Sequence, residues 1–80
     1  MRILEFDSDS FGGVVRELRE DKGWTQKDLS ERSWHLRLSS VKNYEQGVAL
    51  PSLQGLMAIA HALDIDEIRI DCRKGGRKWN

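Results

Sequence analysis

A chain of 80 residues has room for one domain, and a domain of this size buries only about 60% of its unfolded surface, so a dimer would add stability. Hydrophobic residues make up 39% and charged residues 32%, which is ordinary for a soluble globular domain. No apolar run approaches the roughly 20 residues of a membrane span, and no signal-peptide pattern is present. The single Cys72 cannot form an intrachain disulfide, which agrees with a reducing compartment. We therefore expect a cytoplasmic protein without a membrane partner.

The net charge is zero, and the charge is spread unevenly along the chain. Residues 25–47 carry four basic and three acidic groups, and residues 73–80 carry four basic groups and no acidic group. The segments 1–24 and 48–72 are acidic overall. A nucleic-acid partner requires a positive surface. The candidate surface therefore lies in the central segment and the tail, although its surplus of positive charge is small.

The first part of the chain predicts a short strand followed by a helix. Met1–Phe6 alternates in the manner of a strand, and any of the polar residues Asp7–Ser10 can cap the helix that follows. The apolar positions of this helix are Phe11, Val14, Val15 and Leu18. Gly23 ends it, and Trp24 is interpreted as the apolar residue of a hydrophobic staple before the next helix.

The segment from Thr25 to Gly47 predicts two short helices with a break between them, which is a helix-turn-helix. Thr25 and Asp28 have the spacing of a capping box, the break falls at 33–36, and Gly47 suits the left-handed residue that ends a helix. At about 100° per residue, the second helix has two different sides. One arc, whose only charge is positive, holds Leu38, Ser39, Lys42, Asn43 and Gln46, and the opposite arc holds Ser40, Val41 and Tyr44. Phosphates and base edges require an arc without acids, and a short amphipathic helix facing solvent explains the pattern equally well.

The last part of the chain predicts one more helix and a second strand. Pro51 and Ser52 are a helix start signal. The apolar stripe expected to face the core is Leu53, Leu56, Met57, Ala60 and Leu63. His61 is interpreted as a satisfied or half-exposed side chain and not as a ligand. Ile68–Cys72 alternates with period two, which predicts a strand, and residues 73–80 predict a mobile tail.

The two terminal strands need partners, because two strands alone are marginally stable and each leaves an open edge. They can pair with each other, with the same strands of a second copy, or both. Since most homo-oligomers are two-fold, we expect a homodimer formed at least partly through Ile68, Ile70 and Cys72. The alternative is a frayed tail that does not pair.

Three segments together resemble the phage-repressor and Cro-like helix-turn-helix family, also called Xre. They are ELREDKGWTQKDLSERS, VKNYEQG and LPSLQGLMAIAHALDI, and they span about Val14 to Ile65. The resemblance implies a mainly α fold, a repressor-like bundle of about four helices, here with short terminal strands. We expect a strand or arm at 1–7, a DNA-binding domain at 8–66, a dimerisation strand at 67–72 and a basic mobile tail at 73–80.

The resemblance also implies the roles of individual residues. The expected DNA-binding residues are Thr25, Gln26, Arg37, Leu38, Ser39, Lys42, Asn43 and Gln46. The first two would contact a phosphate at the start of a helix. Asn43 would hydrogen-bond adenine, Leu38 would touch a thymine methyl group and Lys42 would reach a phosphate, while Ser39 would reach a base or a phosphate.

Arg19 and Glu45 match an ion pair that ties the first helix to the recognition helix in this family, and two solvated surface charges are the alternative. The sequence also departs from the family pattern. One extra residue lies in the turn at Trp34 and His35, where the family has a glycine, and Arg37 stands where a capping Ser or Thr is expected. The loop 48–50 lacks basic residues. These departures bear on the DNA contacts and not on the fold.

The second strand narrows the resemblance to antitoxins of toxin–antitoxin modules, such as the partner of the Hip kinase toxin. A toxin protein would then be a second partner, and Trp79 would be an anchor for it; chance placement of this tryptophan explains it equally well. No catalytic set, cofactor motif or metal-ligand spacing is found, so we expect no enzyme, no cofactor and no bound metal.

The sequence thus predicts a dimeric DNA-binding transcriptional regulator, expected to be a repressor. Its two recognition helices would lie about 34 Å apart on a palindromic site in double-stranded DNA. The alternative is a protein-interaction module, such as an antitoxin that covers a toxin, with weak or no DNA binding.

Overall fold

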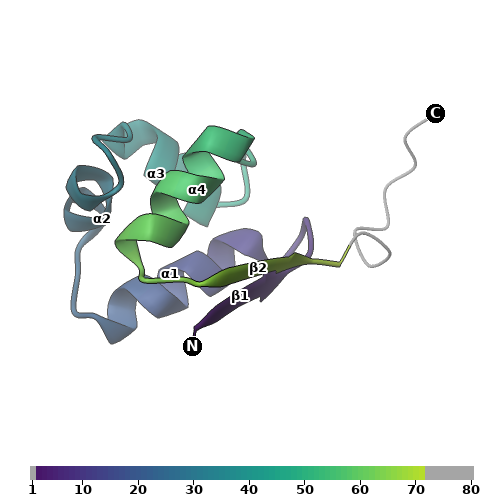
Figure 1. Ribbon diagram of the computed structural model, residues 1–80. Coiled ribbons are helices and arrows are strands. Elements are labelled where there is room, and N and C mark those ends of the chain that lie inside the picture. The colour runs from purple at the N-terminus through teal and green to yellow at the C-terminus, as the bar shows by residue number, and fades with distance from the viewer. Residues whose placement is uncertain (1, 72–80) are drawn as a thin grey trace.

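The computed structural model describes residues 2–71, which form four helices between two short strands (Figure 1). In chain order the elements are β1 (Ile3–Phe6), α1 (Phe11–Asp21), α2 (Gln26–Arg32), α3 (Leu38–Glu45), α4 (Leu53–Ala62) and β2 (Glu67–Ile70). This mainly α arrangement confirms the predicted fold class. Within residues 2–71, no helix is both long and apolar enough to cross a membrane. Cys72, Trp79 and the basic tail lie outside the described residues.

The strands predicted at the two ends of the chain pair with each other in a parallel sheet (Figure 1). Leu4 lies beside Ile68, and Phe6 lies beside Ile70. Parallel strands need a long crossover connection, and here that connection contains all the helices of the described part. The sheet therefore closes the bundle by joining its first and last elements within one copy.

The core lies between this sheet and the four helices. Leu4, Phe11, Val15, Leu29, Ile59 and Leu63 are each fully buried. The prediction that Leu53 and Met57 face the core is wrong, because they are 73% and 50% exposed. α4 buries the side that carries Leu56 and Ile59. Leu53 and Met57 are four residues apart, so they lie together on the outer side of the helix.

Three helices end in the same way, with a left-handed residue followed by a hydrogen bond back over the last turn. The left-handed residues are Gly23, Gly47 and Asp64. The closing N–H groups belong to Trp24, Val48 and Ile65, and they reach the carbonyls of Arg19, Asn43 and Ala60. The start of α1 differs from the prediction. Ser10 makes no capping hydrogen bond with its side chain; its hydroxyl accepts the N–H of Asp7 at 2.9 Å instead.

Candidate nucleic-acid interface

The start of α2 is fixed by the predicted capping box. The hydroxyl of Thr25 accepts the N–H of Asp28 at 3.1 Å, and the carboxylate of Asp28 accepts the N–H of Thr25 at 2.9 Å. The second of these hydrogen bonds stabilises the ionised carboxylate and lowers the pKa of Asp28. Both groups satisfy N–H donors that the first turn of a helix leaves open.

The turn between α2 and α3 has an unusual backbone. Trp34 and His35 both have positive φ, 54° and 61°, and the N–H of Leu36 donates to the carbonyl of Ser33 at 3.0 Å. Two left-handed residues inside such a bond form a turn of the type that favours Asn and Gly. The hydroxyl of Ser30 donates to the carbonyl of Leu36. The extra residue noted in the sequence is thus accommodated in a tight turn in which both central residues are strained.

The two sides of α3 have different environments, as the helical angles predict. Val41 is 1% exposed, and Tyr44 packs against Phe11 with ring centroids 6.3 Å apart. The exposed residues on and beside α3 include Arg37, Ser39, Lys42, Asn43 and Gln46, and Leu38 is half-buried. None of this exposed set carries a negative charge. α3 is therefore anchored by one side and presents a polar, acid-free side to solvent.

The end of α3 is tied to α1 by a buried ion pair. Arg19 donates from Nε and Nη2 to the two carboxylate oxygens of Glu45 at 2.7 and 3.0 Å, and from Nη1 to the carbonyl of Trp24 at 2.7 Å. The side chains of Arg19 and Glu45 are only 10% and 3% exposed. Hydrogen bonding to Glu45 raises the pKa of Arg19 above its ordinary value. This is the pair that the sequence resemblance implies.

Gln26 belongs to the same cluster. Its side-chain amide donates to Glu45 Oε1 at 3.1 Å, and the residue is half-buried. The donor expected to reach a phosphate is therefore already used inside the protein. Since the N–H of Asp28 is engaged by Thr25, the N–H groups of Gln26 and Lys27 are the first-turn donors left for an anion.

Gly12 is a structural residue that the sequence reasoning missed. A Cβ at this position would lie 2.8 Å from the carbonyl oxygen of Glu45, whereas a Cβ at Gly13 would meet nothing within 4 Å. α1 can therefore approach the end of α3 only because residue 12 has no side chain. The pair Gly12-Gly13 stands out within a predicted helix, but nothing in the sequence shows which of the two glycines contacts another helix.

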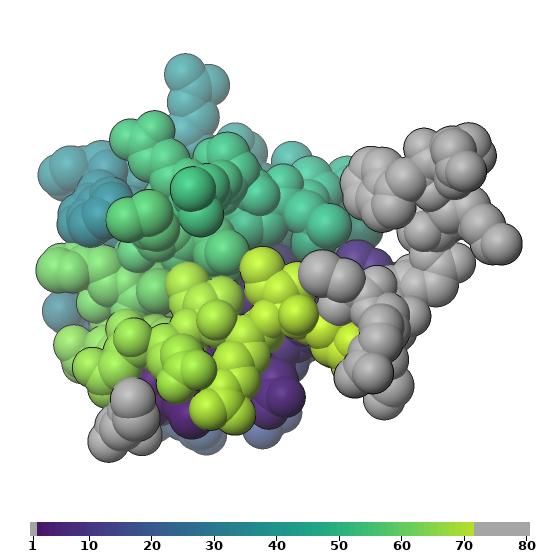
Figure 2. Space-filling view, turned by 45° about the vertical axis from the view of Figure 1, so that its right-hand side comes forward, coloured from purple at the N-terminus to yellow at the C-terminus, as the bar shows by residue number. Residues whose placement is uncertain are grey.

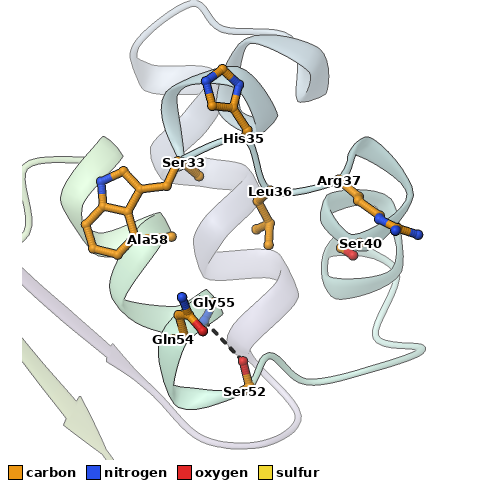
Figure 3. Close-up of a pocket in the computed structure, with 10 residues that line it drawn as sticks. Ser33, His35, Leu36, Arg37, Ser40, Ser52, Gln54, Gly55 and Ala58 are labelled. Atoms are coloured by element: carbon orange, nitrogen blue, oxygen red, sulfur yellow. Dashed lines mark hydrogen bonds between the residues drawn. The ribbon is translucent and has the colours of Figure 1, made fainter.

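A depression of about 340 Å³ lies beside the start of α3 (Figure 3). Figure 3 shows Arg37 and Ser40 on the α3 side and Ser52, Gln54 and Gly55 on the α4 side. Trp34 from the turn also lines it, and its ring lies 5.2 Å from that of His61. The ionisable residues of the lining are His35 and Arg37. Within residues 2–71, no group of three His, Cys, Asp or Glu residues is arranged to hold a metal ion.

The residues predicted to form the dimer lie on β2 and beyond it. Ile68 is half-buried against the core, and Ile70 is 54% exposed. Cys72 lies outside the described residues. Ile68 and Ile70 thus lie beside Leu4 and Phe6 of β1, on the face of the sheet that carries these two buried side chains.

The sequence profile of the family described as Helix-turn-helix matches residues 15–69. The chain belongs to this family. The match covers the segment from α1 to β2 and confirms the Xre-type resemblance. A DNA-binding regulator is the function that a helix-turn-helix protein of this type implies.

Two known proteins illustrate the similarity. Multiprotein-bridging factor 1 of Schizosaccharomyces pombe is 39% identical over 56 residues, which are 70% of this chain and 37% of that protein. The chain thus spans little more than a third of that relative. The crystal structure of the wild-type restriction-modification controller protein C.Esp1396I superposes with a TM-score of 0.68 at 24% identity, over 74% of this chain and 75% of that one. Two mutants of the controller protein give the same TM-score. This likeness supports the helix-turn-helix fold.

Proposed function

We propose that the chain is a sequence-specific transcriptional regulator that places the exposed side of α3 in the major groove of double-stranded DNA. The observation that carries the proposal is the contrast between the sides of this helix. Val41 and Glu45 are held inside, while Lys42 and Asn43 are exposed. Because the buried side fixes the helix, the exposed side is available as a rigid reading surface.

The exposed side chains have chemistry that suits base edges and phosphates. Asn43 can donate to and accept from adenine, and Ser39 can reach a base or a phosphate. Lys42 and Arg37 supply the positive charge for phosphates on either side of the groove. Leu38 is half-buried, so the part that remains exposed would meet a thymine methyl group. Gln46, at the end of α3, is also exposed and completes the set.

The start of α2 would add a phosphate contact through its backbone. Thr25 is exposed, but its hydroxyl is engaged with the N–H of Asp28. The amide of Gln26 is engaged with Glu45. The N–H groups of Gln26 and Lys27 are therefore the donors for this contact, and the side chains of Thr25 and Gln26 position the start of the helix.

We further propose that the regulator acts as a homodimer and a repressor on a palindromic site. A single α3 is short and reads only a few base pairs, whereas a two-fold pair reads two half-sites about 34 Å apart. The names of the similar proteins, a bridging factor and a restriction-modification controller, fit a regulator. The second copy and the repressor role are part of this proposal, and dimerisation through Ile68, Ile70 and Cys72 stays a prediction.

A protein-interaction module is the second candidate, and the exposed apolar side chains of α4 favour it. Leu53 is the most exposed of them at 73%. In this case the chain would cover a partner such as a toxin and would bind DNA weakly or not at all. Salt dependence separates the two candidates, because DNA affinity falls steeply as salt displaces phosphate contacts.

The test is to select bound duplexes from a random pool and to measure their affinity at several salt concentrations. Lys42→Gln is expected to weaken binding to all duplexes and to lower the slope of log affinity against log salt by about one. Arg16→Gln removes the same charge from the outer side of α1 and is the matched control, with no expected change. Failure of the wild-type chain to bind any duplex at low salt would refute the proposal.

A second variant tests sequence recognition. Asn43→Ala is expected to cost about 1 to 3 kcal/mol on the selected site and to relax the base preference at one position. If affinity falls equally on every sequence, Asn43 contacts the backbone and does not read a base.

A further inference from the structure

The depression beside the start of α3 is lined by the residues at which this chain departs from the family pattern. Trp34 and His35 belong to the turn with the extra residue, Arg37 stands at the expected cap position, and all three line the depression. In Figure 2 the blue-green atoms of the segment before α3 lie at the surface beside the green atoms of α4. Both turn residues also have a strained left-handed backbone. Strain of this kind is concentrated at active and ligand-binding sites, so the depression is a candidate ligand site.

The lining of the depression offers hydrogen-bond donors and no carboxylate. Hydroxyl, amide, imidazole, indole and guanidinium groups line it, and Asp and Glu are absent from the lining that residues 2–71 provide. The hydroxyl of Ser33, a residue that is 1% exposed, has no hydrogen-bond partner among the described residues. A buried hydroxyl without a partner costs free energy, which a bound acceptor can offset. The depression therefore suits an anion.

The size of the depression and the ring of Trp34 restrict the ligand further. A volume of about 340 Å³ lies at the lower end of the range for small-molecule pockets, about 300 to 1,000 Å³. Trp34 is 52% exposed, so its indole offers an apolar surface on which a planar group can pack. These properties favour a small organic anion with a planar part over an inorganic ion.

We propose that the depression binds a small organic acid whose carboxylate pairs with Arg37 and whose planar part packs on Trp34. A guanidinium matches a carboxylate with two parallel hydrogen bonds. Figure 3 shows Arg37 at the rim on the α3 side with its guanidinium turned outward, so a bound carboxylate draws this group over the rim. Arg37 is exposed and takes part in no ion pair within residues 2–71. Its side chain is therefore free to make this movement.

The bound acid would regulate DNA binding, and this effect rests on the proposed function. Ser40 lines the depression and lies on the side of α3 opposite to Lys42 and Asn43, so the acid leaves these reading residues uncovered. Arg37 is shared, because the proposed function assigns it to a phosphate. An acid that holds Arg37 removes one phosphate contact and weakens the binding of every duplex.

A titration of the full chain followed by NMR, without DNA, tests the site. The probes are benzoate, nicotinate and indole-3-carboxylate, each compared with its neutral amide at constant ionic strength. At least one acid is expected to shift the backbone signals of residues 33–37 and 52–58 and the indole signal of Trp34. It is also expected to bind at least about 10-fold more tightly than its amide, because only the acid pairs with a charged group. Binding of no acid, or equal binding of every acid and its amide, would overturn the assignment.

Two variants test the residues that hold the acid. Arg37→Gln is expected to abolish the preference for the acid over its amide, and Arg16→Gln, which removes the same charge from the outer side of α1, is the matched control with no expected change. Trp34→Asn removes the ring and keeps a residue that tolerates the left-handed backbone, and it is expected to weaken acid binding about 5-fold. Both side chains are exposed, so circular dichroism is expected to report an intact fold. Acid binding of wild-type strength in both variants would overturn the proposed site.

The regulatory effect is measured on the duplex that the wild-type chain selects. A saturating concentration of the acid is expected to lower the affinity by the same factor as Arg37→Gln does, and to leave the affinity of Arg37→Gln unchanged. An acid that binds and leaves the wild-type affinity unchanged would overturn the regulatory role. Failure of the wild-type chain to bind any duplex would instead refute the proposed function, and the titration without DNA would still decide whether the site exists.

Discussion

The two ends of α3 are held differently, the C-terminal end by buried contacts and the N-terminal end by an exposed turn. At the end of the helix, Glu45 lies in a buried cluster with Arg19 and Gln26, and Gly12 lets α1 approach its carbonyl. At the start, Arg37 provides no side-chain cap, and the helix follows an exposed turn with two left-handed residues. The C-terminal end of α3, at Glu45, is therefore the fixed end. Buried contacts define the position of the helix at Glu45, and the turn sets the approach of the end that carries Leu38 and Ser39.

The largest change in the free energy of unfolding is expected when the buried ion pair at the C-terminal end of α3 is removed. Glu45→Ala leaves the charge of Arg19 buried without its partner, which is expected to lower the free energy of unfolding by about 3 kcal/mol. Arg16→Ala is the control, because Arg16 and Glu20 form an ion pair whose side chains are 64% and 55% exposed. Its loss is expected to cost less than about 1 kcal/mol. Urea denaturation measures both, and equal costs would show that the buried pair does not hold α3.

A smaller loss of stability is expected when a side chain is added at Gly12, where α1 approaches the C-terminal end of α3. Gly12→Ala places a Cβ against the backbone of α3, so two helices must move apart, and the free energy of unfolding is expected to fall by about 2 kcal/mol. Gly13→Ala adds the same methyl group in open space and is expected to stabilise the protein by about 0.5 to 1 kcal/mol, because alanine is the better helix former. Thermal unfolding of the two variants gives the comparison. Similar shifts in both would contradict the packing described for Gly12.

The smallest change in the free energy of unfolding is expected in the turn before α3, where the substitutions should stabilise the protein. Replacing Trp34 by Asn and His35 by Gly supplies the residues that left-handed positions favour, and it is expected to stabilise the protein by about 1 kcal/mol. The loss of the contact between the rings of Trp34 and His61 offsets part of this gain. Thermal unfolding measures the result. A destabilised double variant would mean that the aromatic contact outweighs the backbone strain.

Much of the interface could be predicted because its signals are local. The capping box needs only Thr25 and Asp28, the helix end needs only Gly47, and the division of α3 into two sides follows from its 3.6-residue repeat. The exposure of Lys42 and Asn43 then depends only on Val41 facing inward. The pair of Arg19 and Glu45 is not local, and it was expected only from the family resemblance.

Other features could not be predicted, because they depend on residues far apart in the chain. Gly12 contacts the end of α3 only after the helices have packed, and no neighbour of Gly12 in the sequence indicates this. α4 is apolar over more than half of its circumference, so periodicity could not decide whether Leu53 and Met57 face inward. The engagement of the Gln26 amide by Glu45 likewise required the packed structure.

The amino-acid sequence alone predicts the order of the helices, the caps of α2 and α4, the polar side of α3 and the membership of the helix-turn-helix family. These properties follow from short-range hydrogen bonding and from hydrophobic periodicity, which any segment carries within itself. Three other features emerge only from the packing of the whole chain: β1 pairs with β2 in the same copy, α4 leaves its outer apolar side uncovered, and the backbone of α3 rests on Gly12. Each of these depends on which surfaces meet, and that is settled only when the whole core is packed.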